Sequence, residues 1–234
     1  MKKTAIIFLI LFPFLGNAQK PIDVSIELPA DYPRDMLADF QNMLSVDWCD
    51  FYQDEKTHNY YLRKADIHVG VDNYNDCWQD STVSVYSIPN SLFLINGLKP
   101  RKQPVKTVFL PEENILAGKK QSFDFGGKTY TFRAEAIMPN GETFDYWNDI
   151  KDYKLYFSEE KSSREQLLIT IPQFNNTMLK ILWIGDLDRD GKPDFLLDIS
   201  DFYETTKVAL FLSSTADRRE LVKLAAEAMY SYDC

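Results

Sequence analysis

The sequence predicts a mainly β protein of the β-rich α+β class, with antiparallel sheets and one short helix near the N-terminus. Short apolar runs recur along the chain, and many of them alternate apolar with polar residues as half-buried strands do. Gly-Gly and Asn-Gly steps separate several of these runs, as tight β-hairpins require. Aromatic residues make up 14% of the chain, which argues against disorder.

The N-terminal third of the chain contains the predicted helix. Residues Pro21–Pro29 alternate as a strand does, whereas Asp35–Leu44 places apolar residues at helical spacing. Two further strands are expected over Ala65–Val71 and Ser81–Ile88, with the polar residues Asp72–Asp76 as the loop between them.

Aromatic residues are concentrated between Trp48 and Trp78, and residues 46–64 receive no secondary-structure assignment. These aromatic side chains could form a platform for a sugar or a protein partner, because each large ring offers an apolar face. Alternatively, most of them fill the core of the N-terminal half.

Beyond Pro89, strand-like runs and turn signals alternate at regular intervals. The clearest hairpin has Gly126-Gly127 at its turn, because glycine accepts the positive φ angles of a two-residue turn. Residues Asp217–Tyr230 fit a helix and a strand equally well by periodicity. We expect one domain over residues 19–234, with a soft internal boundary near residue 89. The expected strands are Ser91–Ile95, Lys106–Leu110, Gln121–Phe125, Lys128–Ala136, Lys154–Phe157, Gln166–Ile171 and Met178–Ile184.

Residues 1–18 are typical of a secretory signal peptide. Lys2 and Lys3 precede the apolar run Ala5–Leu15, and small residues up to Ala18 suit signal peptidase. This run is shorter than the roughly 20 residues of a membrane span, and the sequence has no other apolar run of that length. We therefore expect an exported protein, periplasmic or secreted, with no membrane span.

The formal net charge is −9, and it becomes −11 when Lys2 and Lys3 are removed with the signal peptide. An acidic surface repels phosphate backbones, so no nucleic-acid partner is expected. The three cysteines leave at least one thiol unpaired within the chain. Similar aromatic and acidic surroundings favour a disulfide between Cys49 and Cys77, with three reduced thiols, Cys234 included, as the alternative.

The segment Ile184–Ile199 reads IGDLDRDGKPDFLLDI and contains the strongest chemical signal in the chain. Three aspartates at alternate positions can converge only if the backbone curls around a point, and Gly191 permits that curl. Oxygen-only coordination from a loop suits calcium, with a structural role for the ion, and no cysteine or histidine lies nearby for a softer metal. The predicted calcium ligands are the carboxylates of Asp186, Asp188, Asp190 and Asp194 and the backbone carbonyl of Lys192.

The flanks of this loop exclude an EF-hand. Position 12, which should be a glutamate, is Leu197, and the flanking residues are apolar β-type runs. The segment Asp186–Phe195, after Trp183-Ile-Gly, resembles the calcium loop of integrin-type FG-GAP (VCBS) repeats. The resemblance implies a blade-like unit over about residues 178–230, with calcium between two strands and later strands at Val208–Leu212 and Leu221–Ala226. The pattern occurs once, so a complete propeller is not expected.

The sequence contains no Gly-x-Ser-x-Gly elbow, Ser-x-x-Lys or His-Glu-x-x-His motif. We therefore favour a non-enzymatic, exported calcium-binding protein that binds a protein or glycan partner. The alternatives are an envelope or polysaccharide hydrolase using carboxylates that the sequence does not single out, and an inhibitor or immunity protein.

Overall fold

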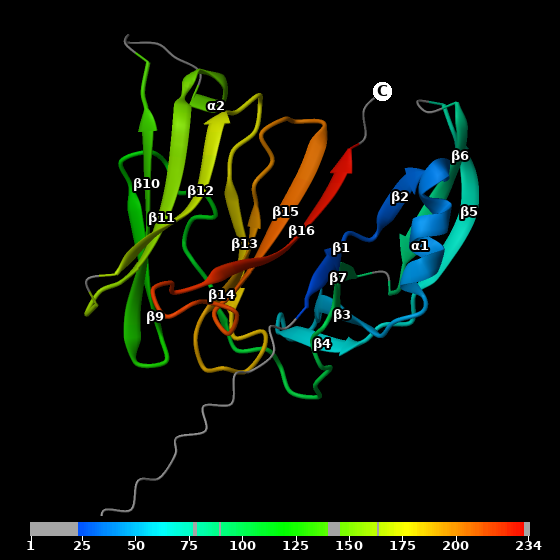
Figure 1. The fold of residues 1–234 in the computed structure, drawn as a ribbon, viewed down its shortest axis with the longest axis horizontal. Coiled ribbons are helices and arrows are strands. Elements are labelled where there is room, and N and C mark those ends of the chain that lie inside the picture. Colours follow the sequence, from blue (N-terminus) through cyan, green and yellow to red (C-terminus); the bar gives the residue numbers. More distant parts are fainter. Residues whose placement is uncertain (1–22, 77–78, 89, 140–145, 163, 232–234) are drawn as a thin grey trace, which may run out of the picture.

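The computed structural model describes residues 23–76, 79–88, 90–139, 146–162 and 164–231 (Figure 1). Strands dominate these residues, and every pairing between the named strands is antiparallel. The predicted β-rich class with antiparallel sheets is confirmed.

The first seven strands form two small sheets. Sheet A has the order β1 (Ser25–Glu27), β7 (Ser91–Asn96), β3 (Trp48–Gln53) and β4 (Tyr60–Lys64). Sheet B has the order β2 (Ala30–Pro33), β6 (Asp80–Tyr86) and β5 (His68–Asn75). The 3-10 turn η1 (Arg34–Met36) and helix α1 (Leu37–Met43) follow β2 and pack on sheet B (Figure 1).

The remaining strands form two larger sheets. Sheet C has the order β16 (Lys223–Ser231), β15 (Thr205–Leu212), β14 (Asp194–Asp198), β13 (Lys180–Gly185) and β8 (Thr107–Val108). Sheet D has the order β12 (Glu165–Gln173), β11 (Lys151–Glu159), β10 (Lys128–Ile137) and β9 (Lys120–Phe125). The short helix α2 (Tyr146–Asp149) precedes β11. Strands β13 to β16 thus form an up-and-down meander.

Sheet C lies between sheet D and sheet A (Figure 1), and both of its faces are buried. On β14, Phe195 and Leu197 belong to the core shared with sheet D, whereas Leu196 belongs to the core shared with sheet A. The inner residues of a strand that is buried on both faces are apolar on both sides. This explains why Phe195–Leu197 of β14 are consecutively apolar instead of alternating with polar residues, whereas the strand begins and ends with aspartate.

The predicted N-terminal helix is confirmed by η1 and α1, whose buried residues Phe40 and Met43 face sheet B. The predicted hairpin is also confirmed, because Gly126 and Gly127 have φ angles of 59° and 78° between β9 and β10. Within Asp217–Tyr230, which fits both periodicities, the residues from Lys223 onward belong to strand β16.

The expected loop Asp72–Asp76 is wrong, because β5 continues to Asn75. A register shift between Val71 and Tyr74 lets Tyr74 and Asn75 pair with Ser81 and Asp80 of β6. Backbone pairing across the hairpin therefore outweighs the low strand propensity of the polar side chains.

Some of the aromatic residues between Trp48 and Trp78 build the core, whereas Tyr52 and Tyr61 are half-buried and belong to no core cluster. Trp48 and Phe51 are buried, and the Phe51 ring contacts Trp183 of sheet C edge-on at a centroid distance of 5.1 Å. Tyr74 is exposed, whereas Trp78 lies outside the described residues.

Cys49 is a free, buried thiol whose sulfur donates to the Leu98 carbonyl at 3.5 Å. Burial raises the Cys49 pKa to about 11. The expected disulfide between Cys49 and Cys77 is therefore not formed, and both Cys77 and Cys234 lie outside the described residues.

The predicted signal peptide, residues 1–18, also lies outside the described residues. Within the part of the chain that the structure describes, no helix is long and apolar enough to cross a membrane. Strands up to Asn96 belong to sheets A and B, and strands from Thr107 onward belong to sheets C and D. One core cluster contains residues of both sheet A and sheet C, so the sheets before residue 97 and those after residue 106 are packed together.

Candidate metal centre

The predicted calcium loop connects β13 to β14 in sheet C. Asp186 directly follows the last residue of β13, and Asp194 is the first residue of β14. Gly185 and Asp194 are partners in the β13–β14 ladder. The antiparallel pairing of these two strands therefore brings the two ends of the loop, and the carboxylates there, to the same edge of the sheet.

Local hydrogen bonds shape the tip of the loop. Asp188 accepts a bond from the Asp190 amide at 3.2 Å, and Asp190 accepts one from the Lys192 amide at 2.8 Å. Arg189 and Gly191 have φ angles of 70° and 83°, in the left-handed region. Aspartate side chains favour such turns because they bond to amides two residues further along, and Gly191 takes its conformation without a Cβ penalty.

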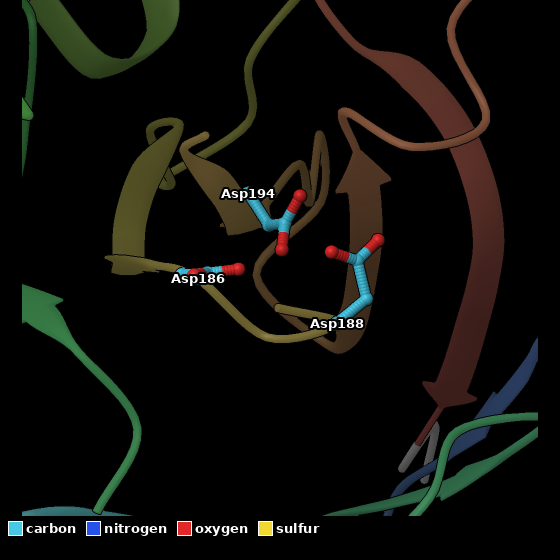
Figure 2. A group of neighbouring side chains, drawn as sticks. All are labelled: Asp186, Asp188 and Asp194. Atoms are coloured by element: carbon cyan, nitrogen blue, oxygen red, sulfur yellow. The ribbon is translucent and has the colours of Figure 1, made fainter. Parts of the chain in front are cut away.

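Three carboxylates converge inside the loop (Figure 2). One oxygen from each of Asp186, Asp188 and Asp194 lies within 4.8 Å of the other two. Two oxygens that bind the same calcium ion at about 2.4 Å each are at most about 4.8 Å apart. The Asp194 side chain is fully buried, and Asp186 and Asp188 are half-buried. The spacing therefore suits a single shared cation.

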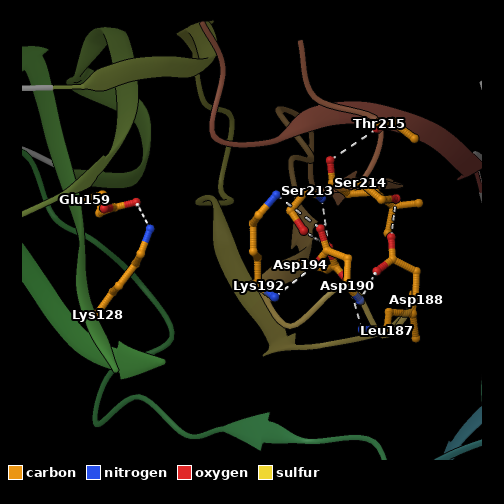
Figure 3. Close-up of polar contacts among 11 residues, drawn as sticks. Lys128, Glu159, Leu187, Asp188, Asp190, Lys192, Asp194, Ser213, Ser214 and Thr215 are labelled. Carbon is orange, nitrogen blue, oxygen red and sulfur yellow. Dashed lines mark hydrogen bonds and ion pairs between the residues drawn. The ribbon is translucent and has the colours of Figure 1, made fainter. Parts of the chain in front are cut away.

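The loop that follows β15 is bonded to these carboxylates (Figure 3). Asp194 accepts a bond from the Leu187 amide at 2.7 Å, and it accepts bonds from the amide and hydroxyl of Ser213 at 2.8 and 3.1 Å. The Ser214 hydroxyl donates to Asp188. These contacts hold the β13–β14 and β15–β16 loops together through two of the three carboxylates.

Burial opposes the ionised form of two of these carboxylates. It raises the Asp194 pKa well above its ordinary value, and the charge of Asp188 adds to this effect, whereas the amides of Ser213 and Leu187 oppose it. Burial also raises the Asp188 pKa, against the hydrogen bond from Ser214. A cation among these groups would favour their ionised forms by supplying the missing opposite charge.

Asp186 has a buried oxygen, Oδ1, that accepts no hydrogen bond from the described residues. A buried polar atom without a partner costs about 1–3 kcal/mol, so such atoms are rare in folded proteins. A cation bound among the three carboxylates would give this oxygen a partner. The donor set therefore fits a metal ion that prefers oxygen ligands.

The loop is held from outside by two neighbouring segments. Arg101 donates to the carbonyls of Asp186 and Leu187 at 2.6 and 3.0 Å. A Cβ atom on Gly126, in the β9–β10 turn, would lie 3.0 Å from the Gly191 carbonyl, so the turn and the loop are in close contact. Sequence patterns missed Arg101, Ser213 and Ser214, because no spacing links residues so far apart in the chain to the loop.

The structure brings together three of the four predicted carboxylates. Asp190 lies outside this group, and its carboxylate contacts the Lys192 side chain, with 3.5 Å between Oδ2 and Nζ. The Lys192 amide donates to the same carboxylate. Asp190 and Lys192 are thus bonded to each other beside the three converging aspartates.

The glycine before the loop is expected to be intolerant of any side chain. In Gly185→Ala the new Cβ would lie 2.2 Å from the Lys106 carbonyl oxygen and 2.3 Å from the Trp183 ring. We expect a loss of about 1–3 kcal/mol in the free energy of unfolding, as for overpacked cores. Urea denaturation measures it.

Gly70→Ala is the matched control for this change, because a Cβ atom at residue 70 would have no atom within 4 Å. It should leave the denaturation midpoint nearly unchanged or raise it slightly. Equal midpoints for Gly185→Ala and wild type would contradict the close approach seen at residue 185.

Comparisons with known proteins yield no match to this chain among protein-family models, curated proteins or solved structures. The resemblance to FG-GAP repeats rests on the residues of the loop itself, Asp186–Phe195.

Proposed function

We propose that this chain is an exported, non-enzymatic calcium-binding protein in which the ion has a structural role. The observation that carries the proposal is the convergence of Asp186, Asp188 and Asp194 within 4.8 Å, together with the unpartnered, buried oxygen of Asp186. Calcium is favoured over a softer metal because all three ligands are carboxylates.

Two further protein ligands belong to the proposed site, and a bidentate carboxylate or water would supply the remaining oxygens. The Asp190 carboxylate and the Lys192 carbonyl belong to the same loop, and calcium takes six to eight oxygen ligands with flexible geometry. The ion pair between Asp190 and Lys192 involves a lysine side chain that is 58% exposed. Such a pair is weak, so Asp190 can leave it for the ion at little cost.

The ion would tie together two loops that are distant in the chain. Asp188 and Asp194 bond to Ser214 and Ser213, which follow β15. A cation held by both carboxylates therefore braces one edge of sheet C across β13, β14 and β15. In the FG-GAP-like interpretation, this edge belongs to a blade-like unit whose surface binds a protein or glycan.

Calcium is expected to raise the melting temperature of the protein. Sites in extracellular modules bind calcium with a Kd of about 10⁻⁴–10⁻³ M, so millimolar calcium adds about 1 kcal/mol of stability. For a chain of this size that corresponds to about 2–4 °C. The measurement is a calcium titration followed by differential scanning calorimetry. Asp188→Ala should abolish the shift, because it removes one ligand while leaving the bonds of Asp194 in place.

Asp47→Ala is the matched control, because the Asp47 side chain is 89% exposed and its one ion pair among the described residues is with an exposed lysine. It should respond to calcium as the wild type does. Absence of any shift in wild type, or an equal shift in Asp188→Ala, would refute the proposed site.

A further inference from the structure

A basic hollow of about 520 Å³ lies beside the calcium loop. Cationic side chains supply most of its lining, and none of the lining residues is acidic. This is unusual for a chain whose formal net charge is −9. The lining residues are Arg63, Lys64, Pro100, Arg101, Lys102, Gln103 and Arg189.

Three separate segments bring these cations together. Arg63 and Lys64 end β4, Lys102 lies in the connection between β7 and β8, and Arg189 is at the tip of the calcium loop. Arg101 links the last two segments, because it donates to the carbonyls of Asp186 and Leu187. The positive charges are therefore gathered by the tertiary fold and positioned by hydrogen bonds to the loop.

The β4 side of the hollow is partly compensated. Arg63 bonds to the buried carboxylate of Asp50 through Nε at 3.4 Å and stacks on the Tyr52 ring. Lys64 pairs with Asp47 at 3.1 Å, but both side chains are exposed, at 73% and 89%. An exposed pair contributes little and is readily exchanged for another anion.

The opposite side of the hollow is only partly compensated, because the carboxylates of Asp186, Asp188 and Asp194 lie near enough to Arg101 to attract it. Within the described residues, neither Lys102 nor Arg189 forms an ion pair. Arg101 and Arg189 line the hollow together, and both guanidinium groups are positively charged at neutral pH. An anion bound in the hollow would lie near both charges and be attracted by them.

We propose that this hollow binds a ligand carrying two or more oxyanion groups, carboxylate or sulfate, either as a free small anion or on a saccharide chain. Guanidinium groups match such groups because their planar donors bind two oxygens at once. The spread of cations over three segments suits several anionic groups better than one. An anion can bind in this hollow without a calcium ion, although Arg189 lies on the loop of the proposed metal centre and Arg101 bonds to that loop.

The test measures binding by isothermal titration calorimetry at low ionic strength. The protein is stripped of calcium and then desalted, because a residual chelator would itself be a polycarboxylate. Citrate is the free-anion probe, dextran sulfate is the saccharide probe, and neutral dextran is the control. We expect citrate or dextran sulfate to bind, with an affinity that falls as salt is added, because salt screens exposed charges.

The double variant Lys102→Gln/Arg189→Gln should weaken this binding at least tenfold. Neither side chain forms an ion pair among the described residues, and glutamine adds no carboxylate beside Asp188 and Asp190, so the fold should be retained. The matched control is Lys119→Gln/Lys120→Gln, which makes the same charge change at exposed positions around the start of β9, outside the lining of the hollow. It should change the affinity by less than about twofold, since distant exposed charges are screened.

Tighter binding of dextran sulfate than of citrate would identify a charged saccharide as the ligand class, and the reverse order would identify a small anion. Either order of affinities supports the site if the double variant at residues 102 and 189 weakens the binding at least tenfold. Absence of binding to both probes would overturn the proposal. Equal loss in the two double variants would also overturn it, because the attraction would then come from overall charge.

Discussion

Asp194→Ala is expected to lower the free energy of unfolding by about 2–5 kcal/mol, because it leaves buried donors without an acceptor. The Asp194 side chain is fully buried and accepts bonds from the amides of Leu187 and Ser213 and from the Ser213 hydroxyl. Each buried donor that loses its only partner costs about 1–3 kcal/mol. The variant would therefore weaken the joint between the β13–β14 and β15–β16 loops.

Two effects compete at this position in the metal-free protein. Asp188 repels Asp194, and this repulsion raises the pKa of the buried Asp194 carboxyl; the substitution removes it. The loss in the free energy of unfolding should therefore lie near the lower end of the range without calcium. It should lie near the upper end with calcium, since the ion cancels that repulsion. Urea denaturation of the wild type and the variant, each with and without calcium, measures both values.

Asp190→Ala provides the matched control within the same loop. The Asp190 carboxylate is outside the group of three, and its hydrogen bond to the Lys192 amide is exposed. Its removal should cost about 0.5–1 kcal/mol in the metal-free protein. If Asp190→Ala proves as destabilising as Asp194→Ala, the buried hydrogen bonds of Asp194 are not what holds the loop.

Phe195→Ala is expected to cost about 3–5 kcal/mol, the range for truncating a buried aromatic residue. Phe195 is fully buried on β14, and its ring contacts Phe132, Phe157 and Phe211 at centroid distances of 5.1, 5.0 and 5.4 Å. Two of these partners belong to sheet D and one to sheet C. Truncation would thus leave a cavity in the core between the two sheets.

Phe109→Ala makes the same chemical change at a side chain that is 69% exposed. Its cost should stay below about 1 kcal/mol, because little buried area is lost. Chemical denaturation of both variants gives the comparison. Similar midpoints for the two variants would show that sheet D contributes far less to stability than its packing on sheet C implies.

Local patterns were sufficient to predict much of the secondary structure. The helix near Asp35, the hairpin at Gly126-Gly127 and most strands after Pro89 depend on spacing and turn residues that lie within a few positions of one another. The turn at Asp186–Asp194 was predicted for the same reason, since aspartates at alternate positions before a glycine shape a turn through bonds to nearby amides.

The strand state of residues 223–231 could not be predicted from periodicity, because both patterns were satisfied. Pairing with β15 decides it, and the paired residues lie 11 to 26 positions apart in the chain, from Leu212 with Lys223 to Thr205 with Ser231. The strand continuing through Tyr74 and Asn75 has a similar cause, namely backbone pairing with β6 across a register shift. Hydrogen bonding between strands is non-local, so the composition of one segment does not reveal it.

The sequence by itself determined that the chain is β-rich and which aspartates could meet in one loop. Only the tertiary structure decided that Asp186, Asp188 and Asp194 converge while Asp190 turns to Lys192. It also brought Ser213, Ser214 and Arg101 to the loop, and it gathered the cations of the basic hollow. The physical reason is that burial and charge at a site depend on the distant segments packed around it, which no short spacing records.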